Sequence, residues 1–411
     1  MIEYFYSDPK VLQHYRSGPL GPHLDRFAQL LKQAGYTWLS GQDKLRVVVQ
    51  LNQWLIAKQY PLSQLDDRLV RAFRADRHKR RSSQHGEKST LDLFLRMLRE
   101  ADLIPRVPAK TACGPVDLLV QDYAQFLIQE RCLSSITVVH RLPVARQFLT
   151  YCLRAGKLRL NTLQPGDISR FVLQAVRERR RDHCQLVTTT LRSFLDFLCQ
   201  HGWLKSPLRA AVPTVASGRP PDLPVFLEPE QIEQVLRGCD RSTLDGRRDY
   251  AILLLLARLG LRANEVCSLT LEDINWSSGE VLIRGKRGRE DRLPLPPDVG
   301  HALATYLKQG RPPSSCRRVF LCLNAPYRSL VGPTISSVVE RALARTDIVS
   351  AHKGAHLLRH SLATRMLRGG ASLAQIGQVL RHQHIDTTEI YARVDHKALR
   401  VLAQPWPGGV R

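Results

Sequence analysis

The last third of the chain concentrates residue types that can handle a phosphate group. His356, Arg359 and His360 lie three and one positions apart, so in a helix their side chains leave from one face. Arginine can hold two phosphate oxygens at once, and histidine exchanges protons near neutral pH. A further histidine, His382, and Tyr391 follow, and a tyrosine hydroxyl can act as a covalent nucleophile. This combination fits phosphoryl transfer.

Two more cations lie upstream. Arg262 follows the predicted helix Tyr250–Leu259 and the break at Gly260. Lys286 lies at the tip of a predicted β-hairpin, because alternating apolar residues flank the glycine-containing turn 285–289. A second arginine would complete a clamp on the non-bridging oxygens and stabilise charge developing on phosphorus. A lysine whose pKa is lowered by nearby cations can protonate a departing 5′ oxygen, although the position alone also fits a surface lysine in a basic turn.

Capping signals predict the helices that position these side chains. Gly369 and the glycine after it end the helix that carries the first histidines, since glycine accepts a left-handed C-cap. Ser372 and Gln375 have the spacing of a capping box at the start of the next helix. Asp386 and Glu389 repeat that spacing just before the tyrosine.

In type, order and spacing these residues resemble the catalytic set of the tyrosine recombinase (phage integrase-like) family. The resemblance covers about residues 227–394 and extends more weakly back to about residue 117. The intervals match the family's: 286 − 262 = 24, 382 − 359 = 23 and 391 − 382 = 9. Carried over to this sequence, the implied catalytic set is Arg262, Lys286, His356, Arg359, His382 and the nucleophile Tyr391.

The resemblance also implies an activity. It predicts a site-specific DNA strand transferase in which Tyr391 cleaves DNA, holds it through a 3′-phosphotyrosyl link and religates it to another strand, as expected of a mobile-element integrase. Glu265 matches the acidic residue that follows the family's first arginine. Arg381 stands where the family commonly has glycine, which leaves the chemistry intact and would add a phosphate contact. The implied partners are double-stranded DNA and a homotetramer on paired sites, with other recombinase subunits as a further candidate.

Two alternatives remain open from the sequence. A type IB topoisomerase-like relaxase uses similar chemistry but does not exchange partner strands. A DNA-binding regulator with an inert site belongs to a different class, although the intact six-residue set disfavours it. No Asp/Glu cluster typical of a Mg²⁺ site accompanies the set, and the energy of the bond is kept in the phosphotyrosyl link, so neither metal nor cofactor is expected.

Composition supports a nucleic-acid partner. The 411 residues contain 61 Lys and Arg against 37 Asp and Glu, a net charge of +24 that favours a polyanion. No apolar run approaches the roughly 18 residues of a membrane span, and charged residues within positions 1–20 exclude a signal peptide, so no membrane partner is expected. Nine cysteines without a CxxC pair indicate neither a disulfide framework nor a zinc site. The predicted location is the reducing cytoplasm, at the nucleoid when DNA is bound.

The periodicity predicts a mainly α fold: helical DNA-binding parts plus a mostly helical catalytic domain with a small β-hairpin sheet. Residues 111–211 resemble the family's helical (SAM-like) core-binding domain, 212–226 form a Pro-rich linker and 227–411 the catalytic domain with a C-terminal tail. Residues 1–110 are an added helical region, and a loosely matching apolar pattern allows the interpretation that it repeats the core-binding fold. Arginine-rich stretches at 74–88 and 177–181 fit either phosphate contact or a solvated surface.

Overall fold

A computed structural model gives the fold. It describes residues 1–78, 86–105, 114–154, 157–177, 181–214, 224–285, 288–382, 384 and 386–391. The chain divides into two compact units, one formed by Val107–Pro220 and the other by Met1–Arg106 together with Pro221–Arg411. The mainly helical fold predicted from the sequence is confirmed. Within the described residues, no helix is long and apolar enough to cross a membrane.

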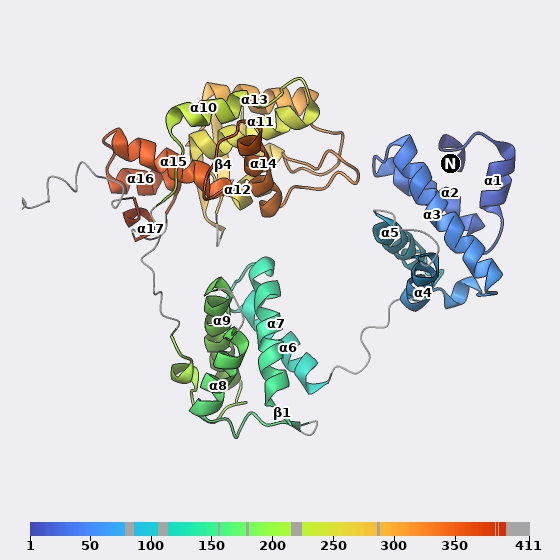
Figure 1. Cartoon of the computed structure of the whole chain (residues 1–411), viewed down its shortest axis with the longest axis horizontal. Coiled ribbons are helices and arrows are strands. Elements are labelled where there is room, and N and C mark those ends of the chain that lie inside the picture. Colours follow the sequence, from blue (N-terminus) through green and yellow to red (C-terminus); the bar gives the residue numbers. More distant parts are fainter. Residues whose placement is uncertain are drawn as a thin grey trace, which may run out of the picture. The chain divides into compact units, whose positions relative to one another are not determined.

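The N-terminal helices, drawn in shades of blue in Figure 1, have a hydrophobic core of their own, made of residues between Ile2 and Ile104. The side chain of Thr37 caps the longest of them, as expected for a threonine at that position. The elements are η1 (Ile2–Tyr4), α1 (Pro9–Arg16), α2 (Gly21–Gln33), α3 (Trp38–Ala57), η2 (Leu62–Gln64), α4 (Asp67–His78) and α5 (Glu87–Glu100).

The unit Val107–Pro220 is a second helical bundle with a separate core, formed by residues between Leu119 and Val212. Proline occupies the first position of two of its helices, where a missing N–H costs nothing. Its elements are α6 (Pro115–Gln129), α7 (Ser135–Cys152), β1 (Leu153–Arg154), β2 (Lys157–Leu158), α8 (Pro165–Val176), α9 (Arg181–Gln200) and η3 (Arg209–Ala211). In the arginine-rich stretch 177–181, Arg177 directly follows α8 and Arg181 is the first residue of α9, while residues 178–180 lie outside the described residues.

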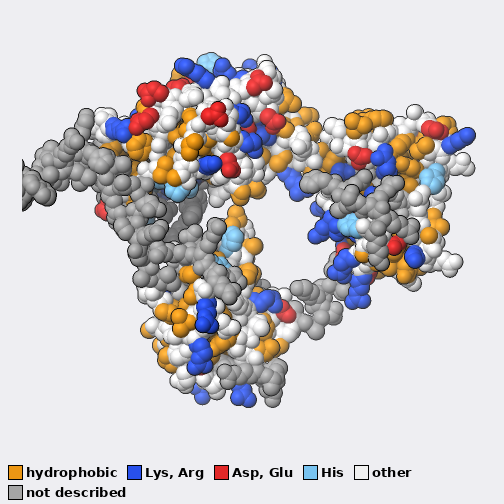
Figure 2. All heavy atoms as spheres, in the orientation of Figure 1, with side chains coloured by type: hydrophobic (Ala, Val, Ile, Leu, Met, Phe, Trp, Pro, Cys, Tyr) orange, Lys and Arg blue, Asp and Glu red, His pale blue; other side chains and the backbone are white. Residues whose placement is uncertain are grey.

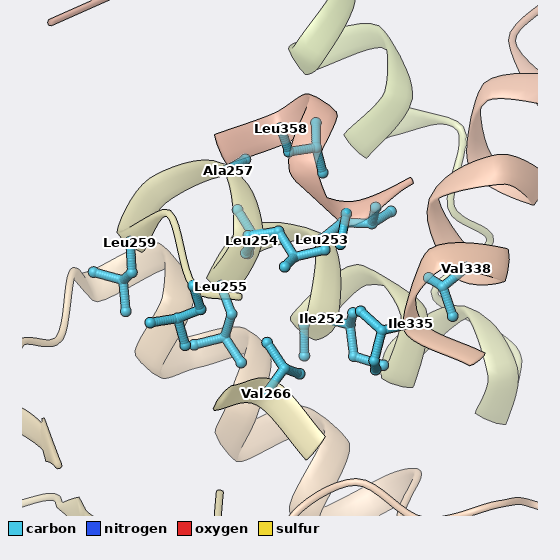
Figure 3. Packing of buried hydrophobic residues seen from close by; sticks show 14 of the residues in the cluster. Ile252, Leu253, Leu254, Leu255, Ala257, Leu259, Val266, Ile335, Val338 and Leu358 are labelled. Atoms are coloured by element: carbon cyan, nitrogen blue, oxygen red, sulfur yellow. The ribbon is translucent and has the colours of Figure 1, made fainter. Parts of the chain in front are cut away.

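Residues 224–391 form the part that carries the predicted catalytic set. Its core surrounds α11 (Leu244–Leu259), which is apolar on nearly every side and is therefore buried by its neighbours. Figure 3 shows leucines and Ile252 of α11 packed against Val266, Val338 and Leu358 from other helices. The remaining helices are α10 (Pro229–Arg237), α12 (Ala263–Ser268), η4 (Leu271–Asp273), α13 (Pro297–Gln309), α14 (Gly332–Arg345), α15 (Ala355–Arg368), α16 (Leu373–Leu380) and α17 (Asp386–Glu389).

The predicted hairpin is present and belongs to a three-stranded antiparallel sheet in the order β3-β4-β5. The strands are β3 (Ile274–Asn275), β4 (Glu280–Arg284) and β5 (Glu290–Pro294). Val281 pairs with Leu293, and both face the core. Beyond the last pair, Gly285 N–H donates to the carbonyl of Arg289 at 2.7 Å. The two-residue strand β3 was not predicted, because it is too short to show alternation.

Candidate active site

Helix α15 presents three of the predicted residues, as their spacing indicated. His356 is solvent-exposed, Arg359 is buried and His360 is half-buried. The rings of the two histidines lie 6.2 Å apart. The helix ends at Gly369, and Gly370 adopts a left-handed φ of 88°, which confirms the predicted stop.

The Arg359 guanidinium is fixed by the ends of two other helices. It donates to the carbonyls of Gly260, after α11, and of Leu380, at the end of α16. Carbonyl groups at helix C-termini carry partial negative charge, so both contacts favour a cation. Burial and the charges of Arg262 and Arg381 lower the pKa of Arg359, yet it remains above neutral pH, so the group stays charged.

Arg262 is held by a capping box of its own helix. It is the N-cap of α12, and the Glu265 carboxylate accepts from its backbone N–H at 2.8 Å and from its Nη1 at 2.7 Å. Glu265 is 6% exposed and also accepts from Arg381 Nη2 at 2.9 Å. Burial pushes the pKa of Glu265 upward, but Arg381 and Arg262 outweigh it and hold that pKa below its usual value. The carboxylate therefore fixes two guanidinium groups.

Arg381 does not make the phosphate-facing contact predicted from the sequence. Its side chain is 4% exposed and is taken up by the ion pair with Glu265. Its backbone has a φ of 55°, the left-handed region in which glycine has no steric penalty. The left-handed backbone explains why glycine suits this position, and the ion pair with Glu265 shows the role of the arginine side chain here. The backbone carbonyl of Arg381 also lies 3.4 Å from Arg262 Nη2.

His382 is oriented by a threonine that the sequence reasoning did not single out. The Nδ1 atom of His382 lies 2.6 Å from the Thr388 hydroxyl, and Thr388 is 1% exposed. The preceding helix α16 begins with the predicted capping box of Ser372 and Gln375, both of whose hydrogen bonds are present. The side chain of Asp386, in the second predicted box, lies outside the described side chains.

Tyr391 is buried, and its hydroxyl contacts His360 on helix α15. Its hydroxyl lies 2.8 Å from Nδ1 of His360, and the two rings meet edge to face with centroids 5.7 Å apart. The tyrosine is 1% exposed within a small core that includes Leu362 and Leu380. His360 was named in the sequence only as a neighbour on the α15 face, so its contact with the predicted nucleophile is new.

The site keeps its histidines neutral and its tyrosine protonated at neutral pH. Burial, reinforced by nearby cationic groups, lowers the pKa of His360 and of His382 to about 4. Partial desolvation by its neighbours, with the charges of Arg359 and Arg262, also lowers the pKa of His356, although part of its side chain stays in contact with solvent. Burial raises the pKa of Tyr391 to about 12, although Arg359 and Arg262 oppose the shift. A neutral imidazole next to a protonated phenol can accept its proton.

These pKa values predict a loss of stability in acid. His360 and His382 have pKa values of about 4 in the folded protein, against about 6.5 in an unfolded chain. Below about pH 6.5 the two histidines take up protons in the unfolded chain but not in the folded protein. The folded protein therefore has its full stability above about pH 6.5 and loses stability as the pH falls toward 4. After allowance for solvent screening, we expect about 1 kcal/mol per histidine between about pH 7.5 and pH 5. Urea unfolding of the wild type and of His360→Gln/His382→Gln at both pH values measures it; an equal pH dependence in the two proteins would contradict it.

Five of the six predicted residues meet in this site. The two arginines, Arg262 and Arg359, lie close enough to the other three residues for their charges to lower the pKa of each. These three residues are His356, His382 and Tyr391. Lys286 lies outside the described residues. The sequence reasoning named His360 as a residue on the face of Arg359 but did not predict its contact with Tyr391. It did not single out Thr388, for which the sequence gives no local signal.

The chain matches a known family and several of its members. Residues 225–398 match the model of the phage integrase family. A Sinorhizobium fredii (strain NBRC 101917 / NGR234) protein named as an integrase/recombinase, y4rA, is 40% identical over 409 residues, covering 99% of each chain. The tyrosine recombinase XerD of Listeria monocytogenes serotype 4b (strain F2365) is 31% identical over 290 residues, which cover 69% of this chain and 96% of XerD.

The fold agrees with these matches. The XerH site-specific recombinase, solved in a post-cleavage complex with its palindromic difH substrate, superposes with a TM-score of 0.56 at 18% identity, covering 76% of this chain and 88% of XerH. The chain therefore belongs to the tyrosine recombinases of the phage integrase family, which are DNA strand-transferring enzymes. Its activity is site-specific recombination.

Proposed function

We propose that this recombinase cleaves duplex DNA with Tyr391, holds the cut strand through a 3′-phosphotyrosyl link and rejoins it to a different strand, in the service of a mobile element. The observation that carries the proposal is the contact between the Tyr391 hydroxyl and a neutral His360, next to two fixed arginines. The name of the relative y4rA, an integrase/recombinase, supports the mobile-element role.

The chemistry follows from the groups in the site. The Tyr391 oxygen attacks phosphorus while its proton passes to Nδ1 of His360, 2.8 Å away. Arg262 and Arg359 stabilise the charge on the non-bridging oxygens, and their positions are fixed before DNA arrives. The P–O5′ bond breaks, and Lys286 protonates the leaving 5′ oxygen. His356 and His382 donate hydrogen bonds to the phosphate. Attack by the 5′-hydroxyl of another strand reverses each step, so no nucleotide or metal cofactor is required.

Removing His360 should slow the cleavage step selectively. We expect His360→Ala to form the covalent adduct about 100-fold more slowly or worse, the usual loss for a general base. DNA affinity should not change, because the ring is half-buried and lies against the tyrosine. The measurement is single-turnover adduct formation on a nicked duplex that traps the link.

A pH profile distinguishes proton transfer from a merely structural role. In His360→Ala the residual rate should rise with pH, because hydroxide replaces the lost base. His301→Gln, at an exposed histidine on α13, is the matched control and should behave as wild type. Equal loss of rate at every pH, or a normal rate, would remove His360 from the proton-transfer role.

Parts of the chain outside the site have roles in this proposal. Residues 111–211 bind duplex DNA together with the catalytic domain 227–411, to which the linker 212–226 joins them, and residues 1–110 add contacts but no chemistry. The DNA complex in which XerH was solved and the net charge of +24 support a DNA partner. Strand exchange between two sites uses four subunits, with the C-terminal tail docking on a neighbour, and takes place in the cytoplasm at the nucleoid.

A pair of assays tests this function against its alternatives. Duplex DNA from the flanks of the protein's own gene supplies candidate sites, and a two-site substrate reports strand exchange. Recombinant product together with a protein–DNA adduct is the expected result. Relaxation of supercoiled DNA without exchange would indicate a type IB topoisomerase-like enzyme, and binding without adduct an inert regulator.

A further inference from the structure

Two sets of four helices in this chain share the packing of their first, second and fourth helices. In α2–α5 and in α6–α9, the first helix packs on the second and the fourth, and the second packs on the fourth. The third helix has 12 residues in each set, with a buried phenylalanine at its seventh position, Phe73 or Phe171. These are separate cores, so the likeness is not a consequence of shared packing.

The buried positions of the two sets coincide residue by residue. An edge-to-face ring pair joins the first and fourth helices in both: Phe27–Phe94 at 5.0 Å and Tyr123–Phe194 at 4.7 Å. Along the fourth helices the match has a constant interval of 100 positions (194 − 94), and each residue is at most 2% exposed. The matched pairs are Thr90 and Thr190, Leu91 and Leu191, Phe94 and Phe194, Leu95 and Leu195, and Leu98 and Leu198.

Polar details repeat as well. The second helices begin with side-chain caps at Thr37 and Ser134, 97 positions apart (134 − 37). At the same interval, Lys44 and Arg141 each donate from the second helix to a hydroxyl on the fourth. The donors are in register, while their acceptors, Thr90 and Ser193, lie one helical turn apart in the common register. Packing, caps and these donors together indicate that the helical set within residues 1–104 repeats the set 114–212.

The two sets differ at the third helix, since α4 packs mainly on α3 whereas α8 packs mainly on α9. Where α8 and α9 meet through Val172, Ala175 and Val187, all buried, the equivalent positions of α4 and α5 are Arg74, Arg77 and Glu87. Glu87 is 3% exposed, accepts from Arg77 and lies within 3.5 Å of Arg74. A buried ion cluster seldom stabilises more than the apolar contact it replaces. Core stability therefore does not explain why α4 contains Arg74 and Arg77. A binding function at the surface of α4 explains them better.

Further cations of α4 and α5, which do not pair with Glu87, indicate what this surface binds. Arg68, Arg71 and Lys88 are exposed, and no carboxylate among the described residues pairs with them. Figure 2 shows Lys and Arg gathered on the side of this helical set where α4 and α5 lie. We call Arg68, Arg71 and Lys88 the α4 basic face. The amino-acid sequence strengthens the case, since both sets have a run of basic residues near the end of the third helix. The run begins at Arg77, in the last turn of α4, and at Arg177, directly after α8.

We propose that residues 1–104 are a duplicated DNA-binding unit that docks on the phosphate backbone of duplex DNA through the α4 basic face. The proposal rests on the proposed function in one respect, that the copy at 114–212 grips DNA. The added unit extends the length of duplex that one subunit holds. Phosphate contacts fix position without reading bases, so its affinity is independent of sequence and sensitive to salt.

Full-length protein with Arg68→Glu/Arg71→Glu/Lys88→Glu tests the proposal on a long mixed-sequence duplex. We expect at least a tenfold loss of affinity at moderate salt, a shorter footprint, and a salt slope smaller by about 0.9 for each phosphate that the variant no longer neutralises. Lys10→Glu/Lys32→Glu/Lys58→Glu changes the same total charge at exposed positions of α1, α2 and the end of α3, and should change affinity far less. Arg68→Ala/Arg71→Ala, with a milder change, should show the same effect in smaller degree.

Equal losses in the two triple variants would mean that bulk charge alone acts, and no loss in the α4 variants would mean that this face does not bind DNA; either result overturns the proposal. Adduct formation on a short nicked duplex keeps the two proposals apart. The α4 variants should form adduct normally at saturating protein. If the wild type forms none, the proposed function fails, whereas the affinity comparison on mixed-sequence DNA still decides the role of the α4 basic face.

Discussion

We expect Tyr391→Phe to abolish the covalent DNA adduct while leaving DNA affinity within about twofold of wild type. The substitution removes one oxygen and keeps the ring, so the small core around it, with Leu362 and Leu380, remains filled. Affinity comes mainly from phosphate contacts made by many cations, none of which involves this hydroxyl. Without the nucleophile no P–O bond to protein can form, and the loss should be complete. Single-turnover reactions on a nicked duplex, resolved by denaturing gel, measure it.

Tyr306→Phe is the matched control. Tyr306 is also fully buried in the same part of the chain, and its hydroxyl accepts a hydrogen bond from the backbone N–H of Leu321 at 3.3 Å. This variant should lose about 1 kcal/mol of stability, the usual worth of one hydrogen bond, and form adduct at the normal rate. Adduct formed by Tyr391→Phe, or a wild-type adduct whose peptide contains another tyrosine, would reject the assignment.

Local signals in the sequence predicted the parts of the site that depend on one helix or one turn. The spacing of His356, Arg359 and His360 placed them on one face, and the capping box at Ser372 starts α16 as predicted. Such features involve residues three or four positions apart, whose geometry the helix fixes. The same holds for the β4–β5 hairpin, whose alternation is visible without a structure.

Contacts between distant residues could not be predicted in this way. The His360–Tyr391 contact spans 31 positions and the Glu265–Arg381 ion pair spans 116. Spacing says which residues share a face, but not which side chain of that face reaches the tyrosine. For the same reason Arg381 was assigned to phosphate: only the structure shows that its side chain turns into the protein, where it pairs with a buried carboxylate.

The proposed N-terminal repeat is an intermediate case. A loose apolar pattern suggests it, but the intervals between the matching positions change from one helix to the next, 97 at the caps and 100 in the last helix. Insertions in loops shift the register without disturbing the packing, so a search at one fixed period misses the likeness. Burial identifies equivalent positions helix by helix, and the register then becomes clear.

Lys286→Ala should cleave ordinary DNA about 100-fold more slowly or worse, yet cleave DNA with sulfur at the bridging 5′ position nearly as fast as wild type. An alkoxide leaves poorly without a proton. A thiolate leaves readily, because its conjugate acid has a pKa of about 8.5. Lys286 itself lies outside the described residues, but β4 and β5 bracket it, and the hydrogen bond from Gly285 to Arg289 closes the hairpin just before the turn. Burst-phase rates on matched oxygen and sulfur substrates make the measurement.

Two control variants test whether rescue by sulfur is specific to Lys286. Arg289→Ala removes another cation of the same turn, one that pairs with Asp291 at 3.2 Å, and should cleave both substrates at nearly wild-type rate. Arg262→Ala should be slow on both, because its guanidinium, fixed by Glu265, stabilises charge on the non-bridging oxygens, which sulfur at the bridging position does not relieve. Rescue of Arg289→Ala in place of Lys286→Ala would place the acid elsewhere in the turn. Rescue of Arg262→Ala would mean that this arginine, and not a lysine, supplies the leaving-group proton.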